Sequence, residues 1–216
     1  AGLATIGGAE SAAAGDTALV GLAIAPAPGR ARYIPLGHSG LAASNLTVAD
    51  VVRRLAPVLA DPSVEKIGHD LKATSFACAQ AGIEVRGTTA DTMVMSYLLD
   101  ATRSSHDLDG LALERAGYRT VTREALAGKG AKAVALDAVP AEAMATYASE
   151  RADLPLTLAP GLTEDLDLAG LTAVYRDLER PLIPVLADIE RAGIRVDTAA
   201  LAALGATMQQ ELDELC

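Results

Sequence analysis

The chain has 216 residues, a net charge of −10 and a pI near 4.7, and half of its residues are hydrophobic. This length allows one ordinary domain plus an appendage, with a core of Ala, Leu, Val and Ile, because Trp is absent and Phe occurs once. The acidic balance argues against a module that binds nucleic acid by itself, since affinity for a phosphate backbone comes mostly from Lys and Arg. Without a signal-peptide pattern or an apolar run of about 18 residues, a cytoplasmic location and no membrane contact are expected.

The first three-quarters of the chain predict strands followed by strands that alternate with helices. Apolar runs over 3–6, 18–25 and 31–36 predict three strands in meander order. The following elements are predicted as a helix over 47–59 capped by Thr47, a strand over 64–68, a helix over 70–81, a strand over 83–85, and helices over 89–99, 107–116, 122–126 and 141–158. Asp91 and Asp100 bracket one of these helices as capping residues or solvated charges. This order predicts a mixed α/β layer fold.

A second unit is predicted to begin near Leu171. Its first helix has one apolar face, and the pair Pro181 and Pro184 predicts a bend or a late start of that helix. Gly193 is a helix stop, followed by a short strand over 194–196 and a last helix capped by Asp197 or Thr198.

Two segments carry a family resemblance: residues 68–74 read GHDLKAT and residues 147–153 read YASERAD. They resemble two active-site segments of the 3′–5′ exonuclease domain of bacterial DNA polymerase I, and residues 174–197 resemble the opening of its polymerase domain. The resemblance implies a ribonuclease H-like exonuclease fold, a mixed sheet flanked by helices, over residues 1–165. The helical start of a truncated polymerase domain is then expected over 171–216.

The residues that bind metal in that family are replaced here. The matching positions hold Ile6, Gly8, Thr74 and Arg151, and Tyr147 matches the tyrosine that helps to orient the attacking water. A two-metal phosphodiesterase needs carboxylates that hold its ions about 4 Å apart. Threonine is a poor ligand for a hard divalent cation, and arginine repels one. The resemblance therefore implies a vestigial site with no intact catalytic residue and no bound metal or other cofactor.

Other carboxylates offer an alternative. Glu10, Asp70, Glu150 and Asp153 are candidates for a rebuilt metal site, although Asp70 also fits a helix N-cap. Glu150 and Asp153 point in different directions around one helix. The histidines and cysteines lack zinc spacing, and Cys78 fits a core position.

The leading hypothesis is a fragment of a DNA polymerase I that acts in replication and repair, with a non-proofreading, structural exonuclease-like domain. Mg²⁺, dNTPs and primer–template DNA are implied for the polymerase domain, whose catalytic carboxylates are expected beyond Cys216. The fragment alone is expected to be a monomer with weak or no DNA binding. One alternative is a working metal-dependent exonuclease with a rearranged carboxylate site; another is a free-standing, non-catalytic interaction module.

Overall fold

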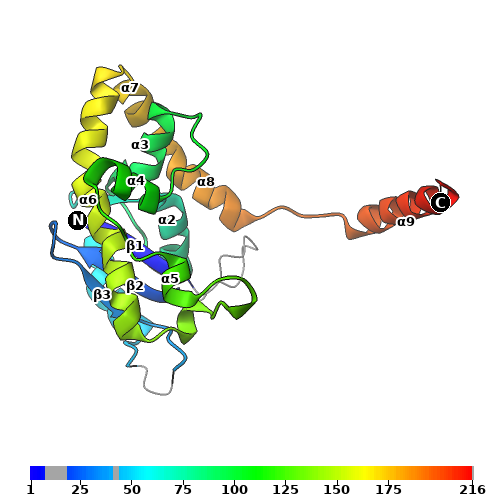
Figure 1. Ribbon diagram of the computed structural model, residues 1–216, viewed down its shortest axis with the longest axis horizontal. Helices are drawn as coiled ribbons and strands as arrows, with labels where there is room; N and C mark the ends of the chain where they lie inside the picture. The colour runs from blue at the N-terminus through cyan, green and yellow to red at the C-terminus, as the bar shows by residue number, and fades with distance from the viewer. Residues whose placement is uncertain (8–18, 41–43, 216) are drawn as a thin grey trace.

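The computed structural model, which describes residues 1–7, 19–40 and 44–215, contains a five-stranded sheet with helices packed on both faces (Figure 1). The strands are β1 (Gly2–Gly7), β2 (Leu19–Ala25), β3 (Arg32–Pro35), β4 (Lys66–Gly68) and β5 (Thr88–Asp91). The helices are α1 (Val48–Leu59), α2 (Leu71–Gln80), α3 (Thr92–Leu99), α4 (Leu108–Ala116), α5 (Arg123–Ala127), α6 (Ala141–Leu168), α7 (Thr172–Val174), α8 (Arg180–Ala192) and α9 (Thr198–Leu215). Short turns of other helical types are η1 (Gly130–Lys132), η2 (Leu136–Ala138) and η3 (Tyr175–Glu179), the last of them π-helical.

The sheet is mixed, with strand order β3-β2-β1-β4-β5. The first three strands form the predicted antiparallel meander, while β4 runs parallel to β1 and β5 runs parallel to β4. Parallel neighbours need crossover connections. Helix α1 lies in the connection from β3 to β4, and α2 in that from β4 to β5. The predicted fold class, a ribonuclease H-like mixed sheet flanked by helices, is confirmed.

Alternation of side chains along β1 builds two cores. Successive residues of a strand point to opposite faces of the sheet. Leu3 joins a cluster with Val51 of α1 and Cys78 of α2, whereas Ile6 joins a cluster with Ala148 of α6. Strand β1 is thus buried between α2 on one side and α6 on the other.

Two predicted strands are wrong. Residues 83–85 form no strand, and the chain pairs instead at β5, which takes the first residues of the helix predicted over 89–99. The helix begins only at Thr92 because the Asp91 carboxylate accepts hydrogen bonds from the first-turn N–H groups. Residues 194–196 also form no strand. Ile194 is 89% exposed, so no buried apolar contact stabilises an extended conformation there.

Helix α6 is longer than predicted. The pattern over 141–158 continues to Leu168 although two prolines, Pro155 and Pro160, lie inside the helix. Each proline removes one backbone hydrogen bond. Leu158, Leu162 and Leu166 are buried along the extension, and this apolar face favours continuing the helix.

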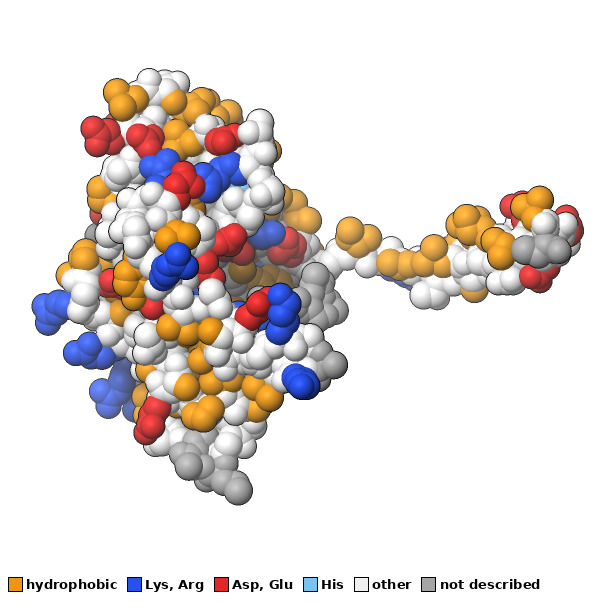
Figure 2. Space-filling model, viewed as in Figure 1, with side chains coloured by type: hydrophobic (Ala, Val, Ile, Leu, Met, Phe, Trp, Pro, Cys, Tyr) orange, Lys and Arg blue, Asp and Glu red, His pale blue; other side chains and the backbone are white. Residues whose placement is uncertain are grey.

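The chain after α6 packs partly on the sheet domain. Tyr175 is buried in a cluster with α6 residues, and its hydroxyl oxygen accepts the N–H of Asp91 at 2.7 Å. Helix α8 packs against α2, with a salt bridge of 2.5 Å between Lys72 and Glu190. Helix α9 stands away from the body, with exposed apolar side chains such as Leu204 (Figures 1 and 2). The proposed division between 1–165 and 171–216 stays a prediction.

Several predicted helix caps agree with the structure. Thr47 and Asp70 are N-caps, and Gly193 ends α8. Asp197 accepts two N–H groups at the start of α9. Pro181 lies in the first turn of α8, but the chain is already helical from Thr172 through η3, so the late start that the two prolines predicted is wrong. No helix in the described part of the chain is long and apolar enough to cross a bilayer.

Cys78 is expected to be inert in the folded protein. Its side chain is 0% exposed, and burial raises the pKa of the thiol to about 12. Because the thiolate is the reactive form, a thiol-specific disulfide reagent should modify Cys78 roughly 100-fold more slowly in the native chain than in urea. The measurement uses a Cys216→Ser variant, so that one thiol is followed. Rapid native labelling would contradict a core role for Cys78.

Candidate functional site: the vestigial exonuclease centre

The positions that match the family's metal ligands lie on β1, α2 and α6. Ile6 on β1 is 4% exposed and packs in an apolar cluster with Ala148 and Ala152 of α6. Thr74 on α2 is 4% exposed. Arg151 lies on α6, one turn after Tyr147. Gly8 lies outside the described residues. The sites of two expected carboxylates are therefore a buried aliphatic and a buried hydroxyl side chain.

The Arg151 guanidinium is held by contacts with Tyr147, Asp109 and Val121. It lies 4.4 Å from the centre of the half-buried Tyr147 ring, a cation–π geometry. Its Nη2 atom pairs with Asp109 Oδ1 at 2.6 Å and donates to the Val121 carbonyl at 3.1 Å. The Arg151 side chain is only 15% exposed, and its Nη1 atom is buried without a hydrogen-bond partner. A fixed positive charge therefore lies at the position where the sequence resemblance implies a metal-binding carboxylate.

The neighbouring carboxylates serve separate structural roles. Glu150 is 8% exposed and accepts hydrogen bonds from the Tyr118 hydroxyl at 2.9 Å and the Val121 N–H at 2.8 Å. Asp153 accepts the Gly29 N–H at 2.7 Å, and Asp70 accepts the Ala73 N–H at 3.1 Å. Glu10 lies outside the described residues.

These residues do not fit a pair of divalent cations. Among residues 1–7, 19–40 and 44–215, no group of three or more His, Cys, Asp or Glu side chains is arranged to hold a metal ion. Asp70, Glu150 and Asp153 each bind a different backbone segment rather than one another. A metal site requires several ligands at defined distances around one point.

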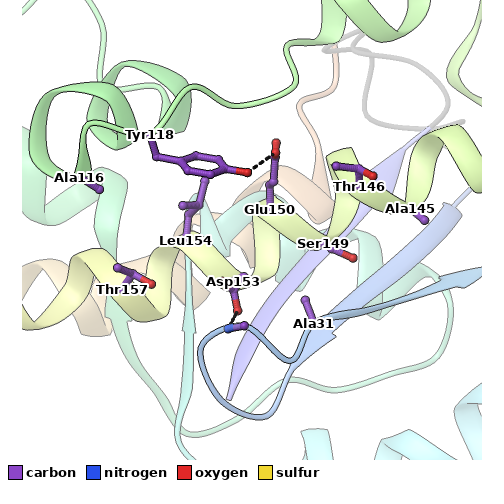
Figure 3. Close-up of a pocket in the computed structure, with 11 residues that line it drawn as sticks. Ala31, Ala116, Tyr118, Ala145, Thr146, Ser149, Glu150, Asp153, Leu154 and Thr157 are labelled. Atoms are coloured by element: carbon purple, nitrogen blue, oxygen red, sulfur yellow. Dashed lines mark hydrogen bonds between the residues drawn. The ribbon is translucent and has the colours of Figure 1, made fainter.

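A cavity of about 590 Å³ runs along the outer side of α6 (Figure 3). Its walls are the turn before β3, the end of α4 with Tyr118, and α6 itself. The lining residues are Gly29, Ala31, Ala116, Tyr118, Ala145, Thr146, Ser149, Glu150, Asp153, Leu154 and Thr157. Both carboxylates in it are engaged by hydrogen bonds, Glu150 with Tyr118 and Asp153 with Gly29 (Figure 3). None of these described lining residues is a Lys or Arg that could attract a phosphate.

Sequence reasoning missed the tertiary contacts of two polar residues, Asp91 and His69. Asp91 is 1% exposed and caps α3, as predicted, but its carboxylate also accepts the N–H of Leu71 at 2.7 Å, so it fixes the start of α2. His69 bonds the Thr92 hydroxyl through Nδ1 at 2.9 Å. Burial, together with the Arg151 charge, lowers the pKa of His69 to about 4. The segment Gly68-His69-Asp70 before a helix indicates neither the Asp91–Leu71 contact nor the His69–Thr92 contact.

These features define a class: a ribonuclease H-like mixed sheet flanked by helices. The comparisons with known proteins then identify the family. Residues 42–154 match the model of the DNA polymerase I ribonuclease H-like domain. The chain belongs to the DNA polymerase I family.

The relatives agree over most of the chain. DNA polymerase I of Pseudomonas aeruginosa is 41% identical over 187 residues, which cover 85% of this chain and 20% of that protein. The Rhizobium leguminosarum enzyme is 38% identical over 190 residues, covering 84% of this chain and 19% of its own length. The solved POL domain of Pol1 from M. smegmatis, in complex with DNA primer-template and dNTP, matches with a TM-score of 0.72 and 28% identity, covering 99% of this chain and 32% of that one. The chain thus spans about a fifth of the length of these curated relatives.

Proposed function

We propose that this chain is the exonuclease-like part of a DNA polymerase I that does not proofread, and that it serves the polymerase in replication and repair as a structural domain. One observation carries the proposal: the Arg151 guanidinium, at the position that the sequence resemblance matches to a metal-binding carboxylate, is paired with Asp109. A cation held there by the protein repels the divalent ions that a two-metal reaction needs. The apolar burial of Ile6 and the hydroxyl of Thr74 support the same conclusion.

The structural role is supported by the face that α8 leaves uncovered. Leu178, just before α8, is 65% exposed, and Val185 and Ile189 on that helix are 50% and 57% exposed. Apolar side chains gathered on one helix face favour burial against another part of the protein. We assign that part to the polymerase body. Mg²⁺, dNTPs and primer–template DNA would bind there; the M. smegmatis protein is in complex with the last two of these.

A nuclease assay tests the proposal. The chain, at high concentration with 3′-labelled single-stranded DNA, is expected to release no nucleotide above an EDTA control in either Mg²⁺ or Mn²⁺, because three described metal positions hold no carboxylate. A proofreading polymerase in the same buffers serves as the positive control.

The competing hypothesis is a working exonuclease built from Glu10, Asp70, Glu150 or Asp153. It requires metal-dependent release that falls in at least one of the variants Glu10→Gln, Asp70→Asn, Glu150→Gln and Asp153→Asn, purified in the same way. That result would overturn the proposal. Release that is equal in all variants would identify a contaminating nuclease, and the assay would then be repeated after a further purification step.

The net charge of −10 leads us to infer weak or no DNA binding by the fragment alone. We also infer a monomer, and a cytoplasmic location in keeping with replication. Fluorescence anisotropy with a labelled single strand, measured over a range of salt concentrations, tests the inference of weak or no DNA binding.

A further inference from the structure

The connection between α4 and α5 is held down on α6 by two consecutive residues. We call residues 117–122 the strap. Within it, Val121 is gripped through both of its main-chain groups: its N–H donates to Glu150 Oε2 at 2.8 Å, and its carbonyl accepts Arg151 Nη2 at 3.1 Å. The Tyr118 hydroxyl donates to the other oxygen of Glu150 (Figure 3). No main-chain donor of Val121 is left for a ligand.

Arg151 joins the strap to α4 as well. Asp109 Oδ1, on α4, pairs with Arg151 Nη2 at 2.6 Å and accepts the Thr120 hydroxyl at 2.6 Å. One carboxylate oxygen therefore links α4, the strap and α6. Because the Tyr147 ring covers one side of the guanidinium, the Arg151 side chain is enclosed rather than offered to solvent.

We propose that Arg151 is a lock that closes the vestigial site by fastening the strap in the absence of metal; this rests on the proposed function. The chemistry of the neighbours carries the inference. The Val121 carbonyl and the Asp109 carboxylate lie next to the Arg151 side chain, and both accept hydrogen bonds. A guanidinium donates to both at once, whereas a carboxylate at this position would face two acceptors and be stable only with a cation between them.

Closure of the strap has a consequence for access. A DNA 3′ end that reached residue 151 would have to displace Val121 and break its bonds to Glu150 and Arg151. The lock thus holds the strap on α6 through contacts between protein groups alone. Holding the strap in this way requires no divalent ion.

Hydrogen exchange of the strap amides tests the lock in the 216-residue chain. Arg151→Ala should speed exchange of the Val121 amide roughly 10- to 100-fold, because a charge-assisted bond and a salt bridge are lost together. Arg151→Asp should speed it at least as much, and neither Mg²⁺ nor EDTA should alter wild-type exchange. Arg53→Ala is the matched control, since Arg53 is 71% exposed and pairs only with Asp50 in its own helix; it should leave the strap unchanged.

Two further variants keep the test decisive if Arg151→Ala fails to fold. Arg151→Lys keeps the charge but not the fork, and Asp109→Asn keeps the shape but not the ion pair. Each variant should speed hydrogen exchange of the strap amides. The increase in exchange rate caused by Asp109→Asn should be smaller in the Arg151→Lys background than in wild type, because the two residues form one ion pair.

The outcomes separate the lock from the proposed function. Unchanged strap exchange in all Arg151 and Asp109 variants would overturn the lock, and the nuclease assay would decide the proposed function independently. A change in wild-type strap exchange on adding Mg²⁺ or EDTA would also overturn it. Restoration of protection in Arg151→Asp by Mg²⁺ would support it, because a cation would then bridge the acceptors that the guanidinium bridges in the wild type. Loss of protection confined to the strap and to the end of α4, with Arg53→Ala unaffected, supports it.

Discussion

Replacing Asp91 with alanine is expected to lower the free energy of unfolding by about 2–4 kcal/mol, a substantial part of the stability of an ordinary domain. Asp91 is 1% exposed, and its carboxylate accepts N–H groups at the starts of two helices: Leu71 at 2.7 Å and Asp70 at 3.2 Å at the start of α2, and Met93 at 3.0 Å and Val94 at 3.4 Å in α3. Alanine would leave these donors unpaired. Burial also raises the pKa of Asp91, so the desolvation relieved on its removal keeps the net loss below the sum of its bonds.

Urea unfolding followed by circular dichroism measures this loss. The free energy of unfolding of Asp91→Asn should lie between those of wild type and Asp91→Ala. The Asn amide keeps one acceptor oxygen but replaces the other with an NH2 donor, which faces the N–H groups of the helix starts. Asp100→Ala is the matched control. Asp100 lies at the other end of α3 and is exposed, and within the described residues its carboxylate bonds Thr102 alone, so a much smaller change than at Asp91 is expected. Equal effects of the two alanine variants would show that Asp91 is an ordinary surface cap.

The positions proposed to have lost their metal ligands are inferred from the sequence because they lie within short motifs. Thr74 and Arg151 are identified by their place after GHDLKA and YASE, and Asp70 by its place before a helix. Such inferences need only local spacing. The cap on α3 at Asp91 belongs to the same group.

The partners of those residues could not be predicted. Asp109 and Val121 lie 42 and 30 positions before Arg151, and no local period relates such distances. Likewise, the bond from Asp91 to the start of α2 exists because β4 and β5 are adjacent in the sheet. The strands expected over 83–85 and 194–196 are absent for a related reason: three residues that alternate apolar, charged and apolar fit a strand or a loop equally well, and only pairing decides.

The stability of the chain is expected to fall by up to about 3 kcal/mol from His69 alone as the pH is lowered from 6.5 to 4. Burial first, and then the Arg151 charge, lower the pKa of His69 to about 4, whereas an unfolded histidine titrates near 6.5. Between these values the unfolded chain binds one more proton than the folded chain, so stability rises with pH across this window and is level below it.

His69→Gln isolates this contribution, because all other titrating groups are shared with wild type. The Thr92 hydroxyl donates to the Gly68 carbonyl at 3.2 Å, so its oxygen accepts the proton on His69 Nδ1, and a glutamine amide can supply the same donor. The difference in unfolding free energy between variant and wild type should therefore shift in favour of the variant as the pH falls from 7 to 4.5. NMR titration of the His69 ring gives the direct reading. A midpoint near 6.5, or parallel pH profiles, would show that the ring is hydrated and that the Arg151 charge does not reach it.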